Sequence, residues 1–200
     1  MESTAYPRVA AQDHNTQKAV RLDRIISGLP LFISAYEKVR DDKEDWLKYF
    51  SDFNTHYADW YVYPIVCTEP IFRAIAEDYE AGESLDYDLC MSNLETQFAD
   101  ILEIIYSAVP RDRVALCSFS RLGPGVDLPL HEHDNEGSLV LHMGLDIPDC
   151  EEGEVGLEHD GGMHYWNGPG DWVVFQDYRK HRAWNLTDQQ RVILYLDFHV

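Results

Sequence analysis

Basic residues and long apolar runs are both scarce in this chain of 200 residues. Lysine and arginine number 16 against 36 aspartates and glutamates, which gives a formal net charge of −20. We therefore expect neither nucleic acid nor an anionic membrane as a partner, because both repel an acidic surface. No apolar run approaches the roughly 18 residues of a membrane-spanning helix, and residues 1–20 lack the apolar core of a signal peptide.

CxxC pairs are absent as well. The cysteines stand apart from one another at Cys67, Cys90, Cys117 and Cys150, so neither a zinc-ribbon pattern nor a disulfide framework is indicated. Reduced thiols are the usual state in the cytoplasm, and we expect a cytoplasmic location. Internal repeats are also missing, and a 45 % share of hydrophobic residues is ample for one folded domain.

The spacing of apolar residues changes near residue 110. Before that point, apolar residues recur at intervals that predict four helices, within residues 20–29, 29–42, 69–82 and 91–109. Ser92 and Glu95 resemble a capping box for the last of these, and Gly82 is placed to end the third. The aromatic residues 49–66 lack this spacing and indicate a loop with a short strand.

After residue 110 the pattern becomes one of short strands and turns. Strands are predicted within seven segments, which are residues 113–122, 138–147, 153–159, 162–166, 171–177, 181–186 and 191–200. Many short strands separated by turns that contain Gly and Pro are typical of a sandwich or barrel. We expect a mainly β protein in one structural domain, with a helical N-terminal support segment (residues 1–110) packed against a β-barrel catalytic core (residues 111–200).

Six of the nine histidines lie in the predicted barrel, between residues 131 and 181. His131 and His133 are two residues apart, so on an extended strand their side chains share a face. An oxygen-activating metal needs a few ligands on one side and open positions on the other, as two histidines and a carboxylate provide for iron(II). In a small barrel the second histidine is expected roughly 40 to 60 residues after the first, and His181 follows His131 by 50 residues.

Arg191 opens the last apolar strand, ten residues after His181. A guanidinium at the start of a buried strand needs an anion, and a planar carboxylate fits it through two parallel hydrogen bonds. Ser120 offers a hydroxyl to the same carboxylate. The alternative interpretation of Arg191 is a surface salt bridge at the edge of the sheet.

A set of spacings across about 80 residues resembles a known family. The segments "FSRLGPGVDLPLHEHDNEGSLVLHMGLDIP" and "DWVVFQDYRKHRAWNLTDQQRVILYLDFH" are similar to the aspartyl/asparaginyl β-hydroxylases, which are iron(II)- and 2-oxoglutarate-dependent dioxygenases. The matching positions are Ser120, Pro124, Gly125, His131, His142, His181, Trp184 and Arg191.

This resemblance implies a double-stranded β-helix, the jelly-roll barrel that cupins share. It implies iron(II) on the catalytic residues His131 and His181, and 2-oxoglutarate held by Arg191 and Ser120 with His142 beside its other carboxylate. The implied reaction consumes O2, hydroxylates an unactivated C–H bond, and releases succinate and CO2. We expect a small-molecule or amino-acid-like substrate, and the sequence leaves the oligomeric state open.

Two positions depart from the family pattern. Val140 stands where an arginine is typical, so a carboxylate contact to co-substrate or substrate is either missing or supplied elsewhere, for which Arg121 and Arg182 are the candidates. His133 stands where the family has Asp or Gly. His133 is therefore a candidate third metal ligand, and its bulk argues against the related halogenases, which keep that position small so that chloride can bind.

A second resemblance gives an alternative function. The segments "GVDLPLHEHDNE" and "HRAWN" look like the two halves of a metal-binding cupin motif, with His133 and Glu136 as ligands. That interpretation implies a metal-binding protein or an isomerase that works without 2-oxoglutarate. It leaves Ser120, His142 and Arg191 without a role.

The aromatic segment before the barrel offers a possible cover for the substrate. Trp60, Tyr61 and Tyr63 are candidates for a lid, and Trp60 and Tyr61 for substrate contact, with core packing as the alternative.

Overall fold

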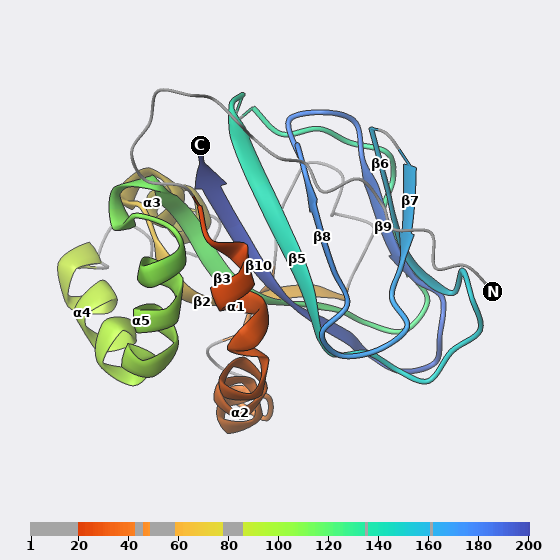
Figure 1. Cartoon of the computed structure of the whole chain (residues 1–200), viewed down its shortest axis with the longest axis horizontal. Coiled ribbons are helices and arrows are strands. Elements are labelled where there is room, and N and C mark those ends of the chain that lie inside the picture. The colour runs from red at the N-terminus through yellow and green to blue at the C-terminus, as the bar shows by residue number, and fades with distance from the viewer. Residues whose placement is uncertain (1–19, 43–45, 49–58, 78–85, 135, 161) are drawn as a thin grey trace.

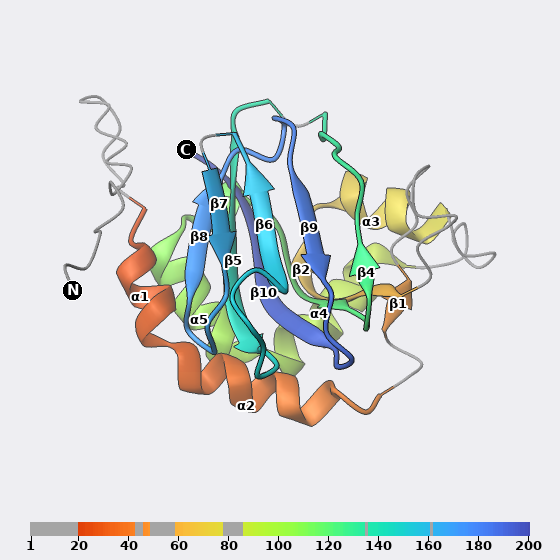
Figure 2. The same ribbon diagram turned by 90° about the vertical axis from the view of Figure 1, so that its right-hand side faces the viewer.

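Two antiparallel sheets face each other in the computed structural model, which describes residues 20–42, 46–48, 59–77, 86–134, 136–160 and 162–200 (Figures 1 and 2). Together they form the expected double-stranded β-helix. The larger sheet has the order β1 (Leu47–Lys48), β2 (Trp60–Cys67), β3 (Val114–Leu122), β10 (Arg191–His199), β5 (Ser138–Asp146) and β8 (Trp172–Phe175). The smaller sheet has the order β4 (Val126–Asp127), β9 (Arg182–Asn185), β6 (Val155–His159) and β7 (Gly162–Tyr165).

Helices cover the face of the larger sheet that points away from the smaller one (Figure 1). In the described residues they are α1 (Leu22–Ser27), α2 (Leu29–Val39), α3 (Glu69–Glu77), α4 (Tyr87–Gln97) and α5 (Ala99–Ala108). None of them is long and apolar enough to cross a membrane. The expectation of a single helix over residues 91–109 is wrong, because the helix is interrupted at Phe98, between α4 and α5.

The expected capping box is also wrong. The N-cap of α4 is Asp86, whose carboxylate accepts a hydrogen bond from the Leu89 N–H at 3.1 Å. Ser92 lies inside α4, and Glu95 pairs instead with Arg111. An aspartate at the N-cap satisfies the same exposed backbone donors that Ser92 was expected to satisfy. Gly82 lies outside the described residues.

All seven strands expected after residue 110 are present. β1 and β4 are additional strands, and β2 is longer than the short strand expected within residues 49–66. β2 is an eight-residue strand that pairs along β3, with Val62 opposite Ser120. The expected division at residue 110 therefore separates the helices from most strands, but it also cuts the larger sheet between β2 and β3.

Alternation along β3 divides the interior into two parts. Cys117 and Phe119 point to the helices, whereas Ser118 and Ser120 point to the space between the sheets. Phe119 is fully buried and makes aromatic contacts with rings of both the helices and β2, at centroid distances of 5.9–6.5 Å from Tyr36, Phe98 and Tyr63. The helices thus fix the back of the sheet whose front carries the site.

Replacing Phe119 by alanine should lower the free energy of unfolding by about 3–5 kcal/mol, because it leaves a cavity where helices and sheet meet. Urea denaturation followed by circular dichroism measures this change. Leu89→Ala is the control, because Leu89 is 59 % exposed on α4 and its loss should change stability by under about 0.5 kcal/mol. Equal effects of the two variants would contradict the proposed role of Phe119.

Candidate active site

His131 and His181 lie side by side although 50 residues separate them in the chain. The His131 N–H donates to the His181 carbonyl at 2.9 Å, and the His181 N–H donates to the His131 carbonyl at 2.8 Å. Their ring centroids are 4.2 Å apart. This reciprocal backbone pair sits just beyond β4 and just before β9, so the smaller sheet fixes both rings.

Side-chain contacts set the tautomers of the two rings. His131 Nδ1 lies 2.8 Å from the Pro129 carbonyl, and His181 Nδ1 lies 2.9 Å from the Arg179 carbonyl. A carbonyl only accepts hydrogen bonds, so each Nδ1 carries the proton and the lone pair is on Nε2. Metal-binding histidines commonly have this arrangement, with one ring nitrogen bonded to a backbone carbonyl.

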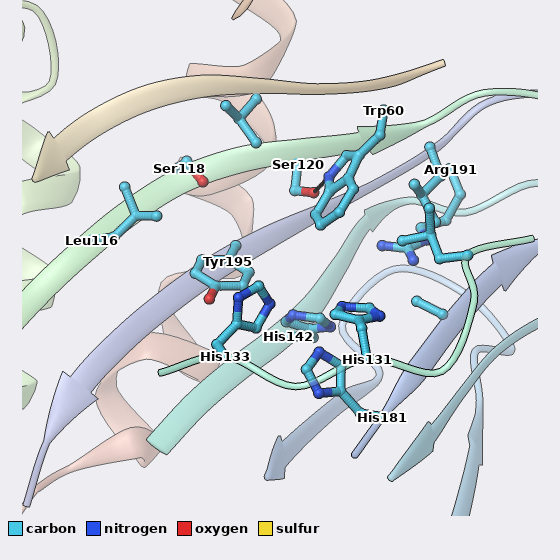
Figure 3. A pocket seen from close by; sticks show the side chains of 14 residues that line it. Trp60, Leu116, Ser118, Ser120, His131, His133, His142, His181, Arg191 and Tyr195 are labelled. Carbon is cyan, nitrogen blue, oxygen red and sulfur yellow. Dashed lines mark hydrogen bonds between the residues drawn. The ribbon is translucent and has the colours of Figure 1, made fainter. Parts of the chain in front are cut away.

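His133 joins these two histidines in one cluster. Its ring centroid is 5.2 Å from that of His131 and 5.4 Å from that of His181. One nitrogen from each of the three rings lies within 4.8 Å of the others, which is close enough for a single metal ion. Figure 3 shows the three rings together on one side of the pocket.

Burial keeps the clustered histidines neutral. Loss of solvent lowers the pKa of all three below the usual 6.5, and that of His181 to about 3. The charge of Asp177 opposes this effect at His131 and His133. Neutral imidazoles can bind a metal without first losing a proton.

Arg191 is a buried cation in the same pocket. Its side chain is 2 % exposed, and its Nε has no hydrogen-bond partner. Among the described residues no carboxylate pairs with it, and its guanidinium lies 5.0 Å from the centroid of the Trp166 ring. Burial lowers its pKa to about 9. An unpaired buried charge lowers the stability of the folded protein by several kcal/mol, so an anion that binds beside Arg191 would be stabilised there.

Polar groups without partners surround Arg191. Both ring nitrogens of His142 and the hydroxyl of Ser118 are buried with no hydrogen bond. Ser120 Oγ accepts a hydrogen bond from Trp60 Nε1 at 3.1 Å, a contact drawn in Figure 3, so its own O–H can still donate. These groups together with Arg191 suit a ligand that is anionic and accepts hydrogen bonds.

The clustered histidines and Arg191 line one pocket, with about 570 Å³ of empty space that is partly open to solvent. Much of its remaining wall is apolar, from Trp60, Val62, Leu116, Leu122, Leu128 and Ala183. The pocket therefore combines a candidate metal centre, a candidate anion site and an apolar surface.

A family model described as aspartyl/asparaginyl beta-hydroxylase matches residues 34–200, which include the whole barrel. This chain belongs to the aspartyl/asparaginyl β-hydroxylase family.

Individual relatives are more distant. The ornithine lipid ester-linked acyl 2-hydroxylase of Rhizobium tropici is 38 % identical over 80 residues, which are 40 % of this chain and 28 % of that protein. The match thus spans less than a third of the curated relative. The structure is similar in part to that of a predicted oxalate decarboxylase from Thermotoga maritima, with 19 % sequence identity and a TM-score of 0.36 over 44 % of this chain and 70 % of the other. It is also similar in part to a cupin protein from Bacteroides fragilis, with 15 % sequence identity and a TM-score of 0.35 over 48 % of this chain and 74 % of the other.

Several residues that we expected at the hydroxylase pocket lie elsewhere. Arg121 stacks on the rings of Trp46 and Tyr61, at 4.5 and 4.7 Å, on the helix side of the sheet. Arg182 forms a two-bond ion pair with Asp127. Tyr63 is 2 % exposed in the core, so of the three aromatic lid candidates only Trp60 lines the pocket. The alternation of β2 and β3 explains this, because Tyr61, Tyr63 and Arg121 are on the opposite face from Ser120.

Neither arginine therefore replaces the one that the family typically has at position 140. Val140 itself is fully buried in the apolar cluster between the two sheets.

Two residues of the cupin interpretation also lie apart from the histidines. Glu136 is exposed, and the buried Asn185 amide donates to three backbone carbonyls, which are those of Leu122, Gly123 and Gln189.

Three residues near the site were not expected from the sequence. Ser118 and Tyr195 lie on the same strand faces as Ser120 and Arg191, at even spacings that could have identified them. Asp177 is 1 % exposed and comes from the turn after β8. Its carboxylate accepts hydrogen bonds from Ser138 Oγ and the Tyr195 hydroxyl at 3.3 and 3.2 Å, a long-range contact that no local pattern reveals.

Acidification should destabilise the metal-free protein. Burial holds the pKa of His142 well below 6.5, so His142 stays neutral in the folded state while the unfolded chain takes up a proton below pH 6.5. Stability is thus retained above pH 6.5 and lost as the pH falls. His142→Gln should make the fall in the free energy of unfolding between pH 6.5 and 5 smaller than in the wild-type protein, as measured by urea denaturation with a chelator. The exposed His199→Gln is the control, and an equal effect there would refute this assignment.

Arg191→Met should make the ligand-free protein more stable, by about 1–4 kcal/mol, because it removes a buried charge for which the described part of the chain provides no carboxylate. Urea denaturation without metal or dicarboxylate measures this difference. A lower stability of the variant would show that the folded protein already compensates the charge.

Proposed function

We propose that this protein is an iron(II)- and 2-oxoglutarate-dependent dioxygenase that hydroxylates an unactivated aliphatic C–H bond. The observation that carries the proposal is Arg191, a buried guanidinium that pairs with no carboxylate of the described residues and lies in the same pocket as three clustered histidines. A metal site alone gives no reason to bury a cation beside it. A dicarboxylate that also binds the metal does.

The residues present fit both groups. His131 and His181 would hold iron(II) through Nε2, the nitrogen that carries the lone pair. Arg191 would pair with the carboxylate of 2-oxoglutarate that lies away from the metal, and Ser118 and Ser120 would donate hydroxyl hydrogen bonds to it. The partnerless ring of His142 would complete its polar surroundings.

When bound, iron(II) and 2-oxoglutarate supply oxidising chemistry, in which O2 gives one oxygen atom to the substrate and one to the succinate formed with CO2. The protein's own residues bind and orient. Arg191 fixes one end of the co-substrate by charge, and the reciprocal His131–His181 backbone pair holds the metal ligands. The apolar wall presents the substrate and excludes water.

That wall supports an apolar part in the substrate. Val62, Leu116 and Leu128 face the pocket and offer no hydrogen bonds. We propose a small molecule that presents an aliphatic chain to the metal. The Rhizobium tropici relative is named for hydroxylation of a lipid acyl group, so fatty acids and acylated amino acids are the first substrates to test.

The cupin-type metal protein or isomerase is less well supported. It needs a carboxylate ligand near the histidines, and Glu136 is exposed and outside their cluster. It also gives no role to Arg191. A halogenase is disfavoured because His133 fills the position that chloride would need.

Anaerobic titration of metal-free protein with iron(II) and then 2-oxoglutarate tests the proposal. We expect a weak visible absorption band when both are present, and succinate formation once oxygen is admitted. Arg191→Met should weaken 2-oxoglutarate binding roughly 100-fold or more while iron(II) still binds.

Arg40→Met is the matched control, because Arg40 is exposed at the end of α2. It should leave the band and both affinities unchanged. If iron(II) binds but 2-oxoglutarate produces no band in the wild-type protein, the dioxygenase proposal fails and the cupin-type function is preferred.

A further inference from the structure

Within the proposed metal centre, on which this inference rests, we infer that His133 is the third protein ligand and that Asp177 supplies the negative charge without binding the metal. An aspartate at position 133, one of the two residues of the family pattern, would provide ligand and charge together. Here the two roles are divided between two residues.

The position of His133 supports its role as a ligand. Its ring shares one cluster with His131 and His181, with ligand nitrogens within 4.8 Å of one another. The His133 N–H donates to the Asp177 carbonyl at 3.1 Å, which continues the backbone pairing that joins His131 to His181. The same ladder therefore holds all three rings.

The position of Asp177 supports a charge role. It is 1 % exposed, and its two carboxylate oxygens accept from Ser138 Oγ and the Tyr195 hydroxyl. It is not in the group whose ligand atoms share the 4.8 Å cluster. It nevertheless lies beside that cluster, because its backbone carbonyl accepts from the His133 N–H at 3.1 Å.

Electrostatics give the reason for this division. Three neutral imidazoles would leave a divalent ion with its full charge, in a pocket that already contains the Arg191 cation. A buried carboxylate close by lowers the energy of that ion. Ser138 and Tyr195 keep it in place, so it can act without using a coordination position. Outer partners of this kind commonly change metal affinity by about 10–100-fold.

The test uses metal-free full-length protein and two probe ions. Calorimetry with Co(II) gives the affinity, and pulsed EPR of the Cu(II) form counts the bound imidazoles. The wild-type protein should show three. His133→Ala and His133→Asp should each show two, and His133→Ala should weaken Co(II) binding at least 10-fold. Asp177→Asn should weaken it 10–100-fold while the count stays at three.

Two reference variants separate the possible failures. His131→Ala should abolish binding, and His159→Gln, in the barrel but outside the cluster, should behave as wild type. If His131→Ala loses the metal while His133→Ala keeps the wild-type number of imidazoles and full affinity, His133 is not a ligand but the metal centre stands. If Asp177→Asn retains full affinity, its charge role is wrong. If His131→Ala and His181→Ala both bind like wild type, the proposed function itself fails.

Discussion

The buried guanidinium of Arg191 is the feature that best explains the other polar groups of the pocket. Burial of an unpaired charge lowers the stability of a protein by several kcal/mol. In this fold that charge is buried at Arg191, the first residue of the last strand. The surrounding groups are compatible with an incoming anion. His142 is kept neutral in part by this charge, and the Ser118 hydroxyl has no internal partner. These groups support the proposal that an anion binds beside Arg191.

The arrangement of the clustered histidines depends on backbone pairing between distant segments. The bonds between His131 and His181 bring together two segments that flank the strands of the smaller sheet, and both rings take their tautomer from a carbonyl two residues earlier. Helices on the other side of the larger sheet, packed around Phe119, hold the strands that carry Ser120 and Arg191. Ligand positions therefore depend on rigid elements rather than on the flexible ends of side chains.

Much of this arrangement could be predicted from the sequence, for physical reasons. The strands after residue 110 are predicted by short apolar runs between turns that contain Gly and Pro, and the spacing from His131 to Arg191 predicts residues that do share a pocket. The N-terminal half was harder. β2 is rich in aromatic and β-branched strand formers, but Pro64 lies inside it, next to an irregularity in its pairing with β3, and a proline argues against an interior strand. Arg121 and Tyr61 were expected at the substrate because their strand faces were not assigned. Asp177 was missed because its contacts to Ser138 and Tyr195 are long-range.

The central claim is that one pocket holds a metal on the histidines and a dicarboxylate on Arg191. A crystal structure grown without oxygen, with Mn(II) and 2-oxoglutarate, tests this most directly. The account predicts the metal on His131 and His181, and a 2-oxoglutarate carboxylate on the Arg191 guanidinium. A bound metal with the dicarboxylate elsewhere, or with Arg191 paired to a protein carboxylate, would contradict it.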